Sequence, residues 1–89
     1  METRLDTFNG WQMRATVESR LTTAGHSKYY IVQPVAYKEF STAEPMHPAA
    51  KGHSDGPFEN ADDAFHAAFG DCRRAIAHTI KARNLESFS

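Results

Sequence analysis

The chain has 89 residues with ten basic and eleven acidic side chains, so its net charge is −1. A chain of this length forms one small domain with a single core, and its balanced charge gives no overall electrostatic footprint for nucleic acid or anionic membrane. The single cysteine excludes an intramolecular disulfide and any multi-cysteine zinc site. No apolar run approaches the roughly 18 residues of a membrane span, and the first six residues lack the pattern of a signal peptide. We therefore expect one domain over residues 1–89, in the cytoplasm, with no membrane partner.

The strands are predicted within residues 3–40. Residues Trp11–Glu18 alternate between apolar and polar side chains, which indicates a strand with one buried and one wet face. Asn9-Gly10 favours a type I′ turn and therefore a short leading strand near Arg4–Phe8. Lys28–Gln33 supply aromatic and β-branched residues, and the loop before them is too short for a parallel crossover, so the two runs should pair antiparallel. Pro34 has no N–H donor and should lie at an edge, a bulge or a bend.

Residues 41–58 lose this periodicity and are interrupted by prolines and glycines. A structureless loop of this length is uncommon in a compact domain and is often functional. The alternative is that part of the segment, around Ala49–Ser54, pairs as an irregular edge strand. Both interpretations stay open at this point.

A long amphipathic helix is predicted over residues 61–83, followed by a tail over 84–89. Asn60 is a favourable N-cap with Asp63 in the reciprocal position three residues later. At about 100° per residue, the apolar side chains form one stripe that should cover a sheet face. The fold class is therefore α+β: a three- to four-stranded antiparallel sheet with one long C-terminal helix packed on one face. The expected core residues are Trp11, Met13, Val17, Ile31, Phe65, Phe69, Cys72, Ile76 and Ile80.

Side chains that often carry chemistry are present but poorly arranged. His66 and His78 do not face a common point on the helix, and neither has a partner at the i, i+4 spacing of a helical zinc site. His47 and His53 lie in the loop, where histidines without carboxylate or cysteine partners are usually solvated. A metal site or active site there is therefore the weakest hypothesis. Cys72 falls on the apolar stripe, where burial keeps a thiol inert. We expect no enzyme activity, no catalytic residue, no cofactor and no metal.

Nucleic-acid binding is the alternative function. Arg14 and Arg20 fall on the wet face of the first long strand, where Lys28 and Tyr30 of the next strand can join them. Basic side chains beside aromatic ones are typical of single-strand binding surfaces. Acidic residues interrupt these basic groups along the sequence, among them Glu18 and the three helix aspartates Asp62, Asp63 and Asp71.

Protein–protein contact is the leading function. Tyr29 and Tyr30 are adjacent in sequence, so at least one aromatic side chain must lie outside the helix-covered face, and grouped exposed aromatics are typical of partner surfaces. Gly70 lies toward the solvent side of the helix, either because a partner backbone approaches it or because the position is unconstrained. The candidate partner surface consists of Tyr30, Tyr37, Phe40 and Gly70.

Two segments resemble known patterns. Asn9-Gly10-Trp11 opening a strand, and Gly56-Pro57-Phe58 ahead of Ala61–Ala64 and a helix running to Ile76, resemble small bacterial and prophage-borne proteins of unknown function, built as a β-meander followed by a long helix. The second segment is also similar to the strand-to-helix passage of HicB-like antitoxins and, more loosely, to the β-hairpin–helix half of a double-stranded RNA-binding domain. The resemblance covers about half of the chain. The lysine cluster of the latter domain and the DNA-binding tail of the former are missing, so no functional residue carries over.

These observations lead to one expectation about function. The chain should be a small non-enzymatic accessory protein of prophage origin that acts through a protein partner or a homodimer. Binding of nucleic acid by the outer sheet face is kept as the alternative.

Overall fold

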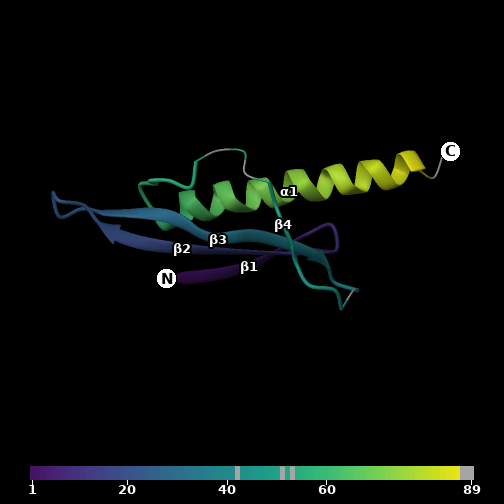
Figure 1. Ribbon diagram of the computed structural model, residues 1–89, viewed down its shortest axis with the longest axis horizontal. Helices are drawn as coiled ribbons and strands as arrows, with labels where there is room; N and C mark the ends of the chain where they lie inside the picture. Colours follow the sequence, from purple (N-terminus) through teal and green to yellow (C-terminus); the bar gives the residue numbers. More distant parts are fainter. Residues whose placement is uncertain (42, 51, 53, 87–89) are drawn as a thin grey trace.

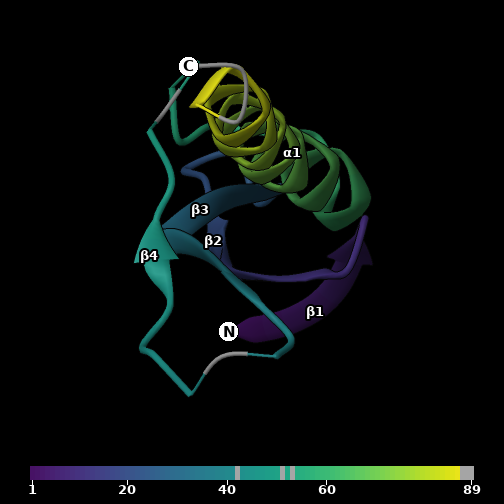
Figure 2. The same cartoon turned by 90° about the vertical axis from the view of Figure 1, so that its right-hand side faces the viewer.

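The computed structural model describes residues 1–41, 43–50, 52 and 54–86. These residues form an antiparallel sheet of four strands in the order β1-β2-β3-β4, with one long helix against it (Figure 1). The elements in chain order are β1 (Glu2–Phe8), β2 (Trp11–Leu21), β3 (Ser27–Glu39), β4 (His47–Pro48) and α1 (Ala61–Glu86). The helix lies on one side of the sheet, as Figure 2 shows from the end of the molecule. The predicted α+β class is confirmed.

The turn between β1 and β2 follows from the Asn-Gly dipeptide. Asn9 and Gly10 both have positive φ angles, 50° and 81°, which a type I′ turn requires. The turn sets the register in which Phe8 lies opposite Trp11 and Glu2 opposite Val17. The leading strand predicted near Arg4–Phe8 is therefore present and begins two residues earlier.

An irregularity in β3 surrounds Pro34. The register between β2 and β3 moves from the pair Arg14–Ala36 to the pair Thr16–Val32, so Ala15 lies opposite three residues of β3. Gln33, inside this bulge, has a φ of 66°. Because the two extra residues are an even number, the alternation of faces continues on both sides of the bulge. The prediction that Pro34 would lie at an edge, bulge or bend is confirmed.

The free edge of β3 is covered at two places by the segment between β3 and α1. Near one end, β4 pairs with Ala36 and Tyr37, and the N–H of Ala49 donates to the carbonyl of Val35 across 2.7 Å. Near the other, Phe58 exchanges backbone hydrogen bonds with Tyr29, and Ile31 donates to the carbonyl of Asp55. The edge pairing predicted around Ala49–Ser54 therefore lies at 47–49 and 55–58 instead. Residues 51 and 53, within the predicted range, are outside the described part of the chain.

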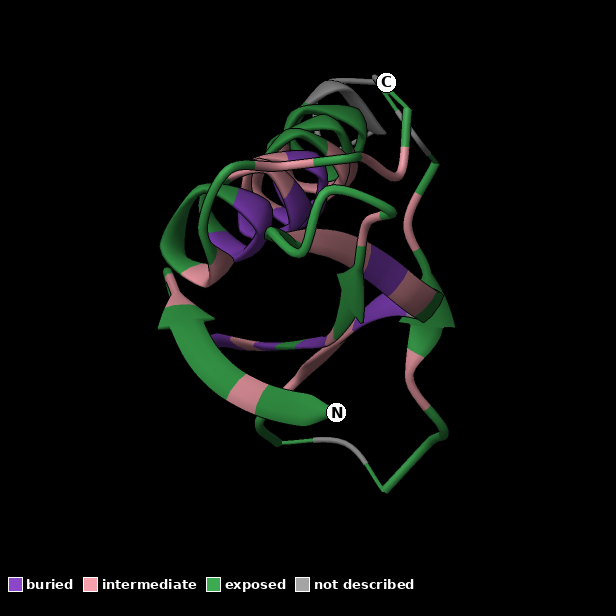
Figure 3. Cartoon of the chain, turned by 90° about the vertical axis from the view of Figure 1, so that its left-hand side faces the viewer, coloured by how far each residue is buried: buried purple, intermediate pink, exposed green. Residues whose placement is uncertain are grey.

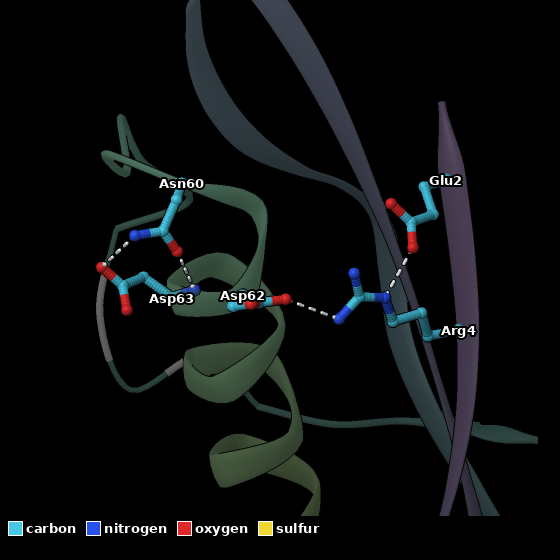
Figure 4. A network of polar contacts seen from close by, with 5 residues as sticks. All are labelled: Glu2, Arg4, Asn60, Asp62 and Asp63. Carbon is cyan, nitrogen blue, oxygen red and sulfur yellow. Dashed lines mark hydrogen bonds and ion pairs between the residues drawn. The ribbon is translucent and has the colours of Figure 1, made fainter.

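The helix begins at its predicted cap. The backbone N–H of Asp63 donates to Oδ1 of Asn60 across 2.8 Å, and the Asn60 amide donates back to the Asp63 carboxylate. Arg4 of β1 connects to the same turn, because its guanidinium contacts Asp62 at 2.9 Å and Glu2 at 2.6 Å (Figure 4). The helix continues to Glu86, three residues beyond the predicted end, since residues 84–86 contain neither proline nor glycine.

The core lies between α1 and the inner faces of β2 and β3 (Figure 3). Eight of the nine predicted core residues are buried. The exception is Ile80, which is only partly buried and packs against the edge of the core. The last turns of α1 extend past the end of the sheet (Figure 1). Met13, Cys72 and Ile76 are the largest side chains that are completely buried.

Candidate functional site

The four residues predicted as a partner surface lie on different parts of the molecule. Tyr30 is on the sheet face opposite the helix, because its cross-strand partner is Glu18, whereas Tyr37 pairs with the buried Met13 on the helix side. Phe40 follows β3 and is 55% exposed. Gly70 lies on α1, where a Cβ atom would meet only the Arg73 and Arg74 guanidinium groups, at 3.8 Å or more. The two tyrosines thus belong to two separate candidate sites.

The first candidate site is the sheet face that points away from α1, called the outer face below. The register brings four basic side chains and one tyrosine to this face, because cross-strand partners project on the same side. These residues are Arg14 and Arg20 from β2 and Lys28, Tyr30 and Lys38 from β3. Lys38 was not among the residues that the sequence indicated.

Most of the acidic residues that interrupt the basic ones in sequence are not on this face. Asp62 contacts Arg4, Asp63 caps the helix, and Asp71 is buried beside Gly52, all on the helix side. Two of the basic side chains of the helix are likewise engaged there, since Arg74 pairs with Asp71 and Arg83 with Glu39. The outer face therefore has more basic than acidic groups although the whole chain has a net charge of −1.

At one end of the outer face, Arg20 and Lys28 are direct cross-strand partners. Like charges in this position destabilise a sheet, and each is partly compensated by a carboxylate. Arg20 contacts Glu18 at 2.9 Å, and Lys28 contacts Glu59 at 2.6 Å. The hydrogen bond from Lys28 lowers the pKa of the Glu59 carboxyl below its ordinary value.

An aromatic side chain lies between these charges. The guanidinium of Arg20 lies 4.6 Å from the centre of the Tyr30 ring, a cation–π distance. Arg14, further along β2, is exposed and has no ion-pair partner among the described residues. The outer face therefore combines charged groups with an aromatic ring, one side of which the Arg20 guanidinium covers.

The second candidate site is a cleft of about 450 Å³ between the C-terminal half of α1 and the end of the sheet. Trp11 and Tyr37 form its floor, with ring centres 5.8 Å apart and planes tilted by 47°. The His47 ring continues this wall at 6.1 Å from Tyr37 with a tilt of 50°. Lys38, Glu39, Glu44 and Arg83 also line the cleft, so Lys38 belongs to the edge of both candidate sites.

The residues of this cleft come from four separate parts of the chain. The helix contributes Thr79 and Arg83, one turn apart, and the guanidinium of Arg83 lies 5.3 Å from the Trp11 ring centre while it pairs with Glu39. Sequence reasoning placed Trp11 in the core. The sequence contains no local signal for the cleft, because the cleft forms between elements that are far apart along the chain.

The histidines and the cysteine form no metal or catalytic group in the described residues. No cluster of three or more histidine, cysteine or acidic side chains suited to a metal is found there. His66 and His78 are exposed on α1, His47 is in the cleft, and His53 is outside the described residues. Cys72 is completely buried, its thiol donates to the Ala36 carbonyl at 3.6 Å, and burial raises its pKa to about 11.

No protein-family model, curated protein or solved structure matches the chain. The resemblance to prophage-borne proteins, HicB-like antitoxins and double-stranded RNA-binding domains therefore stays a prediction. Among the described residues, no helix combines the length and the apolar character needed to span a lipid bilayer.

Proposed function

We propose that the protein is a nucleic-acid-binding module that holds a single strand against the outer face of its sheet. The observation that supports this proposal is that Arg14, Arg20, Lys28 and Lys38 are distributed along the same face as Tyr30. This is the alternative that the sequence left open. The expected protein-partner function, the prophage origin and the cytoplasmic location stay predictions.

The spacing of the basic groups suits an extended strand. Arg14 and Arg20 are six residues apart on β2, which corresponds to about 20 Å along the strand. Lys28 and Lys38 lie beside them on β3, one near each end of this span. Basic groups distributed along such a track neutralise successive phosphates without reading the base sequence.

The aromatic ring favours single-stranded over double-stranded nucleic acid. A base stacks on a tyrosine only when it is free of its own neighbours, as it is in a single strand. The described part of the outer face has strands alone, and no helix there is placed to enter a groove. We therefore expect little sequence preference and a strong dependence of affinity on salt.

Fluorescence anisotropy with labelled single-stranded and duplex oligonucleotides tests the proposal. The single strand should bind at low salt, and the affinity should fall as salt rises. The double variant Arg14→Ala/Lys38→Ala should weaken binding and reduce the salt slope by about 0.7 for each phosphate that is no longer neutralised. Tyr30→Ala should weaken binding at every salt concentration, whereas Tyr30→Phe, which keeps the ring, should bind like the parent.

The control is Lys81→Ala, which removes one positive charge from the exposed side of α1. It should leave the affinity unchanged. The proposal is wrong if the parent protein shows no saturable binding at low salt. It is equally wrong if Lys81→Ala weakens binding as much as the loss of one outer-face charge.

A further inference from the structure

The cleft at the end of α1 combines three aromatic rings with two carboxylates. Trp11, Tyr37 and His47 all line this cleft, and neighbouring rings are tilted by 47° and 50°, so they do not form a flat stack. Glu39 and Glu44 lie at its edge. Aromatic rings with nearby carboxylates are suited to organic cations, which interact favourably with ring faces.

One cation already uses this arrangement. The guanidinium of Arg83 lies over the Trp11 ring and pairs with Glu39, so the chain itself supplies an example of the group that fits there. The two members of the ion pair are held differently: the Arg83 side chain is 59% exposed, whereas that of Glu39 is 28% exposed. The Glu39 carboxylate and the buried Trp11 ring are therefore the more firmly placed part of the site.

We propose that this cleft binds the guanidinium group of an arginine side chain on a protein partner, which takes the place of Arg83 over Trp11 and beside Glu39. The cleft volume of about 450 Å³ lies in the range of ligand sites and leaves room for a side chain to enter. Exchange of one guanidinium for another keeps the charge of the site unchanged. Arg83 then competes with the partner's arginine for the cleft, as a competitor tethered to the protein itself.

Arginine fits this site better than lysine or an anion. Its planar guanidinium can stack on a ring and donate two parallel hydrogen bonds to one carboxylate, which an ammonium group cannot do. Phosphate fits the cleft less well, because Glu39 and Glu44 line it together with Lys38 and Arg83, and Arg83 is already paired with Glu39. The cleft therefore takes a different partner from the one proposed for the outer face, and the two proposals can fail separately.

The fluorescence of Trp11 provides a direct measurement, because it is the only tryptophan of the chain and lines the cleft. The protein is titrated with the peptide acetyl-Gly-Arg-Gly-amide and with matched peptides that contain lysine or citrulline in place of arginine. Citrulline has nearly the shape of arginine but no charge. We expect a saturable change with the arginine peptide, a weaker response to lysine and none to citrulline.

Two variants test the two roles separately: Arg83 as the tethered competitor and Glu39 as the carboxylate that binds the guanidinium. Arg83→Ala should bind the arginine peptide about five- to tenfold more tightly, because an ion pair and a ring contact of partly exposed groups no longer compete. Glu39→Gln should weaken binding, and Lys81→Ala, which lies on α1 outside the cleft lining, should match the parent. A nuclear magnetic resonance titration of the parent protein, following the Trp11 indole and the Arg83 side-chain N–H signals, needs no variant. Both signals should shift together.

The proposal is overturned by any of three results. The first is the absence of a saturable response to the arginine peptide in both the parent and the Arg83→Ala variant. The second is equal binding of the citrulline peptide, and the third is weaker binding after Arg83→Ala. A response of Trp11 to inorganic phosphate equal to that of the arginine peptide would also contradict it, since the cleft would then be an anion site.

Discussion

The buried carboxylate of Asp71 accepts a hydrogen bond from the backbone N–H of Gly52 across 3.2 Å. Asp71 is only 2% exposed although it belongs to the helix and is charged. It also pairs with Arg74, one turn further along α1. This contact holds the segment between β4 and α1 against the side of the helix. Asp71 therefore lies on the helix side and does not interrupt the basic outer face of the sheet.

Replacing Asp71 should therefore destabilise the fold and release this segment. We expect Asp71→Ala to lower the free energy of unfolding by about 1–3 kcal/mol, the usual cost of losing a buried hydrogen-bonding group. Asp71→Asn, which keeps a side-chain oxygen as an acceptor, should cost less. Urea denaturation measures both values, and amide hydrogen exchange at Gly52 should accelerate more in Asp71→Ala. An unchanged unfolding midpoint and exchange rate in both variants would refute this role.

Gly70 provides a test of whether the outward side of α1 is free. Glycine inside a helix costs about 1 kcal/mol relative to alanine. A Cβ at Gly70 would make only ordinary contacts with the ends of two flexible arginines, so Gly70→Ala should raise the free energy of unfolding by about 0.5–1 kcal/mol.

Gly56 is the matched control for this substitution. Its φ is 138°, and a Cβ there would lie 2.7 Å from the Tyr29 carbonyl oxygen, so Gly56→Ala should destabilise the fold. Thermal unfolding of the two variants should therefore shift in opposite directions. A loss of stability in Gly70→Ala would contradict the assignment of Gly70 to an unconstrained position.

Phe65 connects the core to β1. It is 2% exposed, stacks on Phe69 and lies 4.3 Å beneath the Arg4 guanidinium. We expect Phe65→Ala to cost about 3–5 kcal/mol, because it leaves a cavity and removes the surface on which Arg4 packs. The control is Leu5→Ala on β1, the strand that carries Arg4. It should change the free energy of unfolding by less than about 0.5 kcal/mol, since Leu5 is 61% exposed. A cooperative melt near the parental temperature for Phe65→Ala would contradict the core assignment.

Local patterns in the sequence were sufficient for most of the fold. The type I′ turn depends on Asn9-Gly10 alone, and the helix start depends on Asn60 and Asp63, three residues apart. Short-range rules of this kind can be read directly from a sequence. The alternation of β2 likewise predicted which face would be buried.

The candidate sites depend on distances that no local pattern contains. Trp11 and Arg83 are far apart in the sequence and meet only because α1 returns along the sheet. The bulge at Pro34 sets Lys38 opposite Gln12 and so determines its position along the sheet relative to Arg14, whereas its face follows from the alternation that continues through the bulge. From the sequence, Asp62 and Asp71 argued against a basic surface. Only the packing of α1 shows that they lie on the helix side of the sheet and not on the outer face.

The buried thiol of Cys72 gives a prediction about reactivity and pH. Burial raises the pKa of this thiol to about 11, mainly through desolvation and secondarily through the neighbouring Asp71 carboxylate. In the native protein at pH 8 the thiol is therefore protonated, and it should react with a disulfide reagent only after unfolding. The single cysteine makes one thiol per chain the expected end point in denaturant.

The same pKa shift predicts how stability changes at high pH. The unfolded chain releases the thiol proton at the ordinary pKa of cysteine, whereas the folded chain holds it until about pH 11. The stabilisation is thus fully present below the ordinary pKa and is lost as pH rises toward 11. Cys72→Ser keeps a small side chain with a far higher pKa, so its stability should decline less over this interval than that of the parent protein. Identical pH profiles for the two proteins, or rapid reaction of the native thiol at pH 8, would show that Cys72 is not held in this buried position.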